Sequence, residues 1–167
     1  MFGLYAKSIG RGANLLLNVP PNRQGRFSSR DSAALIGFKA MLDKAFKTEL
    51  LKVNAVVNTV HLNKKSVKRR YLGYNYVFKE PIMLNCMVLE EDITSGQAIS
   101  SLIITVSLHG EVKQSIAITT VGHWRMVCFP NCSATEVSVV VTGAKNLPYL
   151  KNIAAYQIPD DLFPFML

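Results

Sequence analysis

The sequence predicts a mainly β protein, an antiparallel β-sandwich that follows a shorter strand–loop–helix segment. Three observations support this prediction. From residue 81 onward, short apolar stretches alternate with turns rich in Gly, Pro, Asn and Ser. Residues 28–47 have the apolar spacing of an amphipathic helix. Ahead of this helix, three consecutive leucines at 15–17 are typical of a strand that is covered on both faces.

The composition is that of a globular protein with its own core. The chain has 167 residues, 49% hydrophobic and 18% charged, which excludes a disordered chain and suits a single domain with an appendage. No apolar run reaches the roughly 18–20 residues of a membrane span, so we expect no membrane partner. The three cysteines are too few for a disulfide framework and have no second ligand pair at zinc spacing, so we expect neither a metal nor a cofactor.

The individual cysteines support different expectations. Cys86 lies in an apolar strand pattern and is predicted to be a buried small side chain. Cys128 and Cys132 flank a predicted turn at residues 129–131, where a local disulfide is an alternative.

The positive charge is concentrated in the first half of the chain. Residues 1–79 carry 15 of the 19 Lys and Arg residues and 3 of the 11 acids. The basic run at residues 64–70 favours a solvated loop or a guarded edge strand; a phosphate-binding surface and a face toward an acidic protein are the alternatives. Tyr74, Tyr76 and Phe78 alternate as one face of a sheet does, which disfavours nucleic acid as a partner.

The elements follow in order. Ser28 and Asp31 form a helix start that resembles a capping box, and a stripe of Leu35, Phe38, Leu42 and Phe46 is predicted to pack as core on the β domain. A strand or an extended linker is expected at 52–60, and a turn at 109–110. The remaining strands are predicted at 74–78, 82–89, 99–108, 112–121, 124–129, 136–141 and 153–158.

Particular motifs carry a resemblance to a known family. Residues 5–12 (YAKSIGRG) and 14–22 (NLLLNVPPN), with Gly25, resemble the segment that closes the catalytic barrel of α-L-fucosidases of glycoside hydrolase family 29. The resemblance continues to about residue 50 and resumes in four short motifs that resemble strands of the family's C-terminal galactose-binding-like jelly roll: LEEDI at 89–93, GQAI at 96–99, TTVG at 119–122 and AAY at 154–156.

This resemblance implies a fold and a parent reaction. The expected domains are a remnant of a (β/α)8 barrel at 1–50 (last strand, loop and helix), an abbreviated β-sandwich at 51–160 and a tail at 161–167. The parent enzyme would hydrolyse terminal α-L-fucosides with retention, through an Asp nucleophile and a Glu acid/base that lie upstream in the barrel. We therefore expect no catalytic residue in this chain, and a structural accessory role for it.

Four residues are candidates for substrate binding. Asn18 would border the sugar pocket if its segment lies in a complete barrel, although an Asn at this position more often stabilises the loop backbone. His123, Trp124 and Arg125 offer an aromatic face and hydrogen-bonding groups in one place, which suits a stand-alone carbohydrate-binding module, the alternative function. A sole Trp is, however, more often part of the core. The consecutive acids Glu90, Glu91 and Asp92 are predicted to be strand-end and turn residues.

Partners and location follow from the resemblance alone. The implied partners are a fucosylated glycan, through the parent enzyme, and the missing barrel or another subunit. A secreted, periplasmic or lysosomal location is expected for the parent family.

Overall fold

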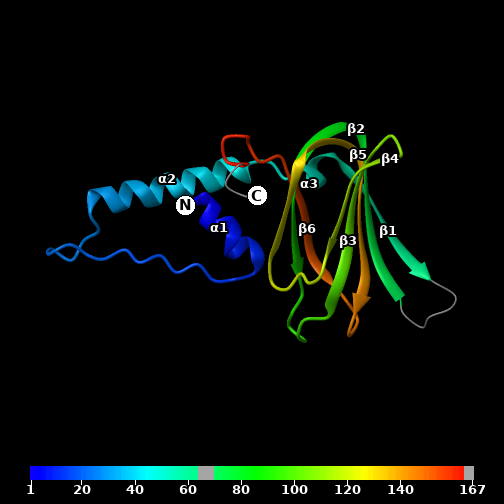
Figure 1. The fold of residues 1–167 in the computed structure, drawn as a ribbon, viewed down its shortest axis with the longest axis horizontal. Helices are drawn as coiled ribbons and strands as arrows, with labels where there is room; N and C mark the ends of the chain where they lie inside the picture. The colour runs from blue at the N-terminus through cyan, green and yellow to red at the C-terminus, as the bar shows by residue number, and fades with distance from the viewer. Residues whose placement is uncertain (64–69, 164–167) are drawn as a thin grey trace.

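The computed structural model describes residues 1–63 and 70–163, which form a helical N-terminal part beside a curved sheet (Figure 1). The helices are α1 (Phe2–Lys7), the short 3-10 helix η1 (Ile9–Arg11), α2 (Ser29–Ala45) and α3 (Leu50–Asn54). The strands are β1 (Ala55–Asn63), β2 (Arg70–Glu91), β3 (Ile99–Leu108), β4 (Glu111–Ile118), β5 (Arg125–Ala144) and β6 (Leu150–Tyr156). The predicted mainly β, antiparallel fold class is confirmed.

The start of α2 is the one the sequence predicts. Ser28 is the N-cap, and its hydroxyl oxygen accepts a hydrogen bond from the backbone N–H of Asp31 at 3.1 Å. The same hydroxyl donates to the Asp31 carboxylate at 2.7 Å. A carboxylate in the first turn also suits the positive end of the helix dipole. Local chemistry alone therefore sets where this helix begins.

The apolar stripe of α2 packs on the β domain at one end only. Ala45 is buried, and Leu42 and Phe46 contact a cluster on the sheet, where the Phe46 and Tyr156 rings meet edge to face. The N-terminal half of α2 extends away from the sheet (Figure 1), and Ile36 is 71% exposed. Phe38 of the stripe meets the Tyr5 ring of α1 edge to face. The prediction that the stripe packs on the β domain is therefore confirmed for Leu42 and Phe46, whereas Phe38 packs on α1.

The strand predicted around the three leucines is also wrong. Residues 13–27 run without helix or strand from η1 to the far end of α2 (Figure 1). Leu16 is 95% exposed. A buried parallel strand needs neighbours on both edges, and no described strand pairs with this segment. The segment has a strand's sequence without the pairing that would make it one.

The sheet has six antiparallel strands, and β2 is its longest. The strand order is β1-β2-β5-β3-β4, and β6 pairs with the second half of β2. β1 pairs with the first half of β2, from Arg70 to Phe78. Strands β1 and β6 therefore share the same edge of β2, one after the other. The chain from residue 50 first forms α3, so the strand expected at 52–60 begins only at Ala55.

Two predicted strand breaks are bulges inside long strands. Val77 lies opposite Glu136 and Ile82 opposite Ala134, so β2 has three extra residues around Pro81. Leu84 lies opposite Cys132 and Cys86 opposite Cys128, so β5 has two extra residues around Pro130. A proline has no N–H for the ladder, and a bulge leaves its residues unpaired. The turn predicted at 129–131 is wrong for this reason, and β5 continues to Ala144.

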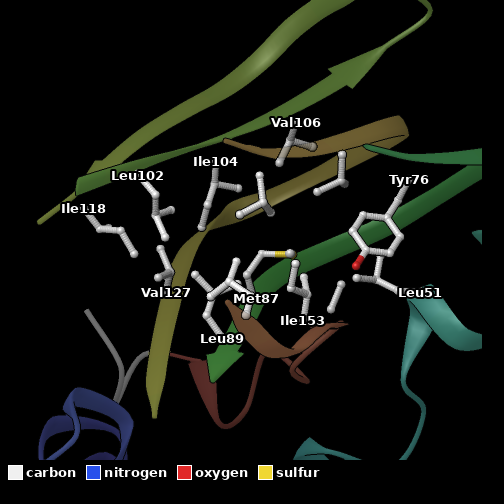
Figure 2. Close-up of a cluster of buried hydrophobic side chains, with 14 of the residues drawn as sticks. Leu51, Tyr76, Met87, Leu89, Leu102, Ile104, Val106, Ile118, Val127 and Ile153 are labelled. Carbon is white, nitrogen blue, oxygen red and sulfur yellow. The ribbon is translucent and has the colours of Figure 1, made fainter. Parts of the chain in front are cut away.

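Two hydrophobic clusters lie on opposite faces of the long strands. The larger cluster fills the concave side of the sheet, where side chains from β2, β3, β5 and β6 point toward one another (Figure 2). Leu84, Ile104 and Val139 of this cluster are fully buried. The smaller cluster joins Cys86 and Val88 of the sheet to α1 and to the end of α2. Because side chains alternate along β2, one face of the strand packs in the larger cluster and the other face packs against the N-terminal part.

The described residues also bear on several other predictions. The strand predicted at 99–108 matches β3, and the turn after it is confirmed: His109 and Gly110 both have positive φ, 50° and 85°, as a tight two-residue hairpin turn requires. The basic run lies outside the described residues, except for Arg70 at the start of β2. The domain boundaries at 50/51 and 160/161 stay predictions.

Candidate functional site

The start of β5 gathers three of the four predicted site residues. Arg125 begins β5, and His123 and Trp124 directly precede it. Trp124 is half-buried and packs on the smaller cluster, whereas His123 is exposed. The indole Nε1 of Trp124 is buried and has no hydrogen-bond partner among the described residues. Trp124 is thus partly a packing residue in this chain and not a fully open stacking platform.

Asn18 does not join this group. It is an exposed residue of segment 13–27, which runs away from the sheet (Figure 1). In the loop that follows, Asn22 organises the backbone. Its carboxamide oxygen accepts hydrogen bonds from the N–H groups of Gln24 at 2.9 Å and Arg26 at 3.0 Å. The loop-stabilising role expected of asparagine is therefore seen at Asn22, and a substrate role for Asn18 stays a prediction.

A cavity of about 300 Å³ lies between η1 and the first residues of β5. Arg11 and Arg125 line it, and none of its lining residues is acidic: Ala6, Arg11, Ile118, Arg125, Met126, Val127 and Cys128. The Nε atom of Arg125 is buried and has no hydrogen-bond partner among the described residues. The guanidinium groups of Arg11 and Arg125 are of the kind that binds a carboxylate or a sugar hydroxyl. This cavity is the candidate site with the clearest binding chemistry.

Cys128 lies beside a second thiol at this cavity. Its Sγ is 3.7 Å from the Sγ of Cys86, which is fully buried and directly opposite in the ladder between β2 and β5. The hydrogen bond between the two thiols lowers the pKa of Cys128. The same bond, together with burial, raises the pKa of Cys86 well above its ordinary value. The thiol that lines the cavity is therefore the more acidic of the two.

A second cavity, of about 310 Å³, opens between α3 and the start of β6. Tyr74 and Tyr76 form its aromatic wall, and Lys52, Lys151 and Asn152 supply polar groups. Burial raises the pKa of Tyr76 to about 12, with smaller contributions from Tyr74 and Glu49. The phenol therefore stays protonated at any ordinary pH and presents a neutral hydroxyl.

Glu91 is the residue with the most specific geometry in the sheet. It is 2% exposed, and one carboxylate oxygen accepts hydrogen bonds from the N–H groups of Ala98 and Ile99, both at 2.7 Å. The other oxygen accepts from the N–H of Gly122 at 3.1 Å. The carboxylate thus joins three of the sequence motifs, LEEDI, GQAI and TTVG. Its role is to hold two loops against the end of β2, which the expectation of a simple strand-end residue missed.

Five other acids of the described residues also hold the backbone or pair with cations. Asp92 accepts from the N–H and the hydroxyl of Thr94, which lowers its pKa. Both Glu49 oxygens accept from backbone N–H groups at α3. Lysine pairs hold three further acids: Asp43, Glu111 and Asp161. None of these contacts brings two carboxylates to one open site, as a glycosidase requires.

Within 1–63 and 70–163, no three His, Cys, Asp or Glu side chains gather as a metal would need. No helix of the same residues combines the length and apolarity needed to cross a membrane.

Sequence reasoning missed the Glu91 clamp and the Cys86–Cys128 pair, because both depend on register. Glu91 differs from its neighbours only in pointing inward. The bulge at Pro81 changes which residues of β2 face the core, and the sequence does not show this change. Residues 86–89 are all apolar and all buried, on one face of β2 or the other, so no alternation in the sequence marks which glutamate points into the sheet.

Comparison with known proteins identifies relatives for nearly the whole chain. No family model matches the chain. Alpha-L-fucosidase 1 of Arabidopsis thaliana is 27% identical over 93% of this chain, which covers 35% of that protein. The chain therefore spans about a third of the length of the curated relatives that it matches.

Solved structures give the same result. The crystal structure of SpGH29 superposes with a TM-score of 0.77 at 27% identity, over 93% of this chain and 38% of that one. A glycoside hydrolase 29 family member from an unknown rumen bacterium also has a TM-score of 0.77, at 29% identity, over 93% of this chain and 28% of that one. The resemblance predicted from the motifs is confirmed.

Proposed function

We propose a structural role for this chain, from the premise that it corresponds to the C-terminal part of glycoside hydrolase family 29 α-L-fucosidases. Residues 13–45 would complete a catalytic barrel that other polypeptide sequence begins, and the β sheet would support that barrel. The observation that carries the proposal is the exposure of apolar side chains in this segment. Leu16, Phe27 and Ile36 are 95%, 58% and 71% exposed, whereas a barrel would cover them.

The proposed division of labour assigns the chemistry to the barrel. Retaining hydrolysis needs two carboxylates about 5–5.5 Å apart on either side of the glycosidic bond. The described acids with the most contacts, Glu49, Glu91 and Asp92, are occupied by backbone N–H groups. The nucleophile and the acid/base would therefore come from the preceding part of the enzyme, and the substrate would be a terminal α-L-fucoside of a glycan.

The test compares the isolated chain with the native protein. We expect the purified 167-residue chain to release no nitrophenol from 4-nitrophenyl α-L-fucoside. An antibody raised against it should retrieve fucosidase activity from the source organism, on a polypeptide about three times longer or on a complex. Hydrolysis by the isolated chain would contradict the proposal, and so would a native protein of 18.5 kDa without fucosidase activity.

Carbohydrate binding is a second candidate function, supported by the cavity at the start of β5. Arg125 lines this cavity together with Arg11, and His123 and Trp124 directly precede Arg125 in the sequence. Guanidinium donors and a half-open indole can hold sugar hydroxyls and a pyranose face. Calorimetry with fucose and a fucosylated trisaccharide tests this function. Binding that Arg125→Ala and Trp124→Ala abolish, and that Arg23→Ala on the exposed loop leaves unchanged, would support it; absence of binding by the folded native chain would reject it.

A further inference from the structure

We propose that Cys86 and Cys128 are a thiol pair that forms a disulfide by exchange with small anionic disulfides. These reagents would reach Cys128 through the cavity at the start of β5. The proposal stands on the register of two strands, on one sulfur–sulfur distance and on the charge of one cavity. It does not depend on the proposed role in a fucosidase.

The backbone places the two cysteines at a spacing that a disulfide accepts. Cys86 and Cys128 are directly opposite in the antiparallel pairing of β2 with β5. Opposed residues in such a pair have Cα atoms about 4.5–5.5 Å apart, within the roughly 4.4–6.8 Å that disulfides span. The two Sγ atoms already lie 3.7 Å apart. Side-chain rotation can close the remaining gap to the bond length of about 2.05 Å without moving the strands.

The third cysteine lies in a different place. Cys132 is opposite Leu84, on the other side of the bulge around Pro130. The extra residues of this bulge separate it from the register that joins Cys86 to Cys128. Cys132 is therefore the natural control, and the local Cys128–Cys132 bridge is the competing outcome.

The two thiols differ in access, and this difference sets the order of reaction. Cys86 is fully buried among the side chains of the smaller cluster, including Phe2 and Ala6. Cys128 lines the cavity of about 300 Å³. Its pKa is also the lowered one of the pair, and the thiolate is the reactive form. Cys128 thus reacts first, and Cys86 is the resolving thiol.

The cavity selects for negative charge. Arg11 and Arg125 line it together with Cys128, and its lining contains no acid. Two guanidinium groups favour a reagent that carries carboxylates. Glutathione disulfide is a reagent of this class and serves as the probe.

The chemistry balances with that oxidant. The Cys128 thiolate, after losing its proton to water, attacks one sulfur of glutathione disulfide, whose S–S bond breaks to release one glutathione thiolate. Cys86 then loses its proton and attacks the Cys128 sulfur, which releases the second glutathione. The two leaving thiolates take up the two protons. The protein loses two thiol hydrogens and gains one disulfide, and one glutathione disulfide becomes two glutathiones.

The test is peptide mapping of the intact chain after equilibration in a glutathione redox buffer and alkylation. We expect Cys86 and Cys128 in one disulfide-linked peptide pair and Cys132 alkylated. The link encloses a long loop, since the two positions differ by 42. The oxidised chain should therefore melt about 5–10 °C higher than the reduced chain. Alkylated Cys86 and Cys128 in the folded, oxidised sample, or a bridge to Cys132, would overturn the proposal.

Three variants test the order of reaction. Cys132→Ser should keep the disulfide and the rise in melting temperature. Cys86→Ser should accumulate one glutathione on Cys128, whereas Cys128→Ser should leave Cys86 unmodified while the chain stays folded by circular dichroism. Equal labelling of Cys86 in the Cys128→Ser variant would contradict the assigned order.

The rate of the exchange reaction tests the role of the arginines that line the cavity. Arg11→Ala should slow the reaction with glutathione disulfide several-fold and leave the reaction with the neutral 2-hydroxyethyl disulfide unchanged. Equal rates of the native chain and the variant with glutathione disulfide would reject the role of the cavity charge.

Discussion

The N-terminal part, residues 1–46, and the sheet, residues 70–156, differ in how well their sequence motifs are satisfied. In the sheet, three short motifs meet at one buried carboxylate, that of Glu91. In the N-terminal part, the longest and most recognisable motif contains the most exposed leucine, Leu16. The contrast teaches that a motif can be specific in sequence and still lack its structural partners. The motifs of the sheet meet one another among the described residues, whereas segment 13–27 leaves its central leucine exposed.

The largest expected effect is at the Glu91 clamp. Glu91→Ala leaves three buried N–H donors without an acceptor, so we expect a loss of about 3–5 kcal/mol in the free energy of unfolding. Urea denaturation followed by circular dichroism measures it. Glu90→Ala is the control, because Glu90 accepts only from Asn152 at 3.2 Å and its loss should cost about 0.5 kcal/mol. Equal effects of the two substitutions would contradict the clamp.

The second largest effect is expected in the core, where a buried isoleucine is compared with the exposed Leu16. Ile104→Ala removes a fully buried side chain of the larger cluster and should cost about 2–5 kcal/mol. Leu16→Ala, at 95% exposure, should change the stability of the isolated chain by less than about 0.5 kcal/mol. Thermal melting of both variants checks the prediction. A large loss of stability in Leu16→Ala would show that segment 13–27 is packed in solution and would contradict its exposure in the structure.

The Leu16→Ala variant also tests the proposed place of segment 13–27 in a fucosidase. If a barrel covers segment 13–27, Leu16→Ala should lower fucosidase activity or solubility there although it leaves the isolated chain stable. An unchanged native enzyme would argue that this segment stays outside any barrel.

A pH effect is expected in the sheet. The pKa of Tyr76 is about 12 in the folded chain, raised from 10.0 mainly by burial. Because the folded state holds this proton more tightly, its contribution to stability is fully present below pH 10 and is lost as the pH rises from 10 toward 12. The loss should amount to about 2 kcal/mol. Melting temperatures from pH 8 to 11.5 should fall less steeply for Tyr76→Phe, and identical slopes would contradict the assignment.

The smallest effect is in the N-terminal part. Ser28→Ala removes the N-cap of α2 and should cost about 1 kcal/mol of helix stability. Most of α2 extends from the sheet, so the change should appear as faster amide hydrogen exchange in residues 29–34. Exchange in β3 should stay unchanged. Ser29→Ala, one position later, is the matched control with no cap to lose.

Prediction succeeded where structure depends on neighbours in sequence. The cap at Ser28, the strand at 99–108 and the turn at His109 and Gly110 are local features, and all three are confirmed. Prediction was wrong at Pro81 and Pro130, where a proline normally ends a strand. There the pairing continues on both sides, and a bulge accommodates the missing N–H. A bulge depends on the partner strand and cannot be identified in one strand alone.

The candidate site was likewise predicted only where its residues are neighbours in the sequence. The sequence alone brought His123, Trp124 and Arg125 together because they are consecutive. It did not bring Arg11 and Arg125 to one cavity, because that cavity depends on η1 packing on β5, where Gly10 lies against Met126. A Cβ at Gly10 would lie 3.1 Å from the Met126 sulfur, so a larger residue would require the Met126 side chain to shift.

The sequence by itself determined the mainly β character of the chain, the start of its long helix and its resemblance to family 29 fucosidases. These features reside in the alternation of side chains, in one capping residue and in short motifs, all of which are local. Only the tertiary structure decided which glutamate is buried, which two cysteines meet and which leucine is left exposed. Burial and pairing are set by segments distant in the chain. A shift of one residue in register would turn Glu91 to the other face and separate the two cysteines, and Leu16 is exposed because no described strand pairs with its segment.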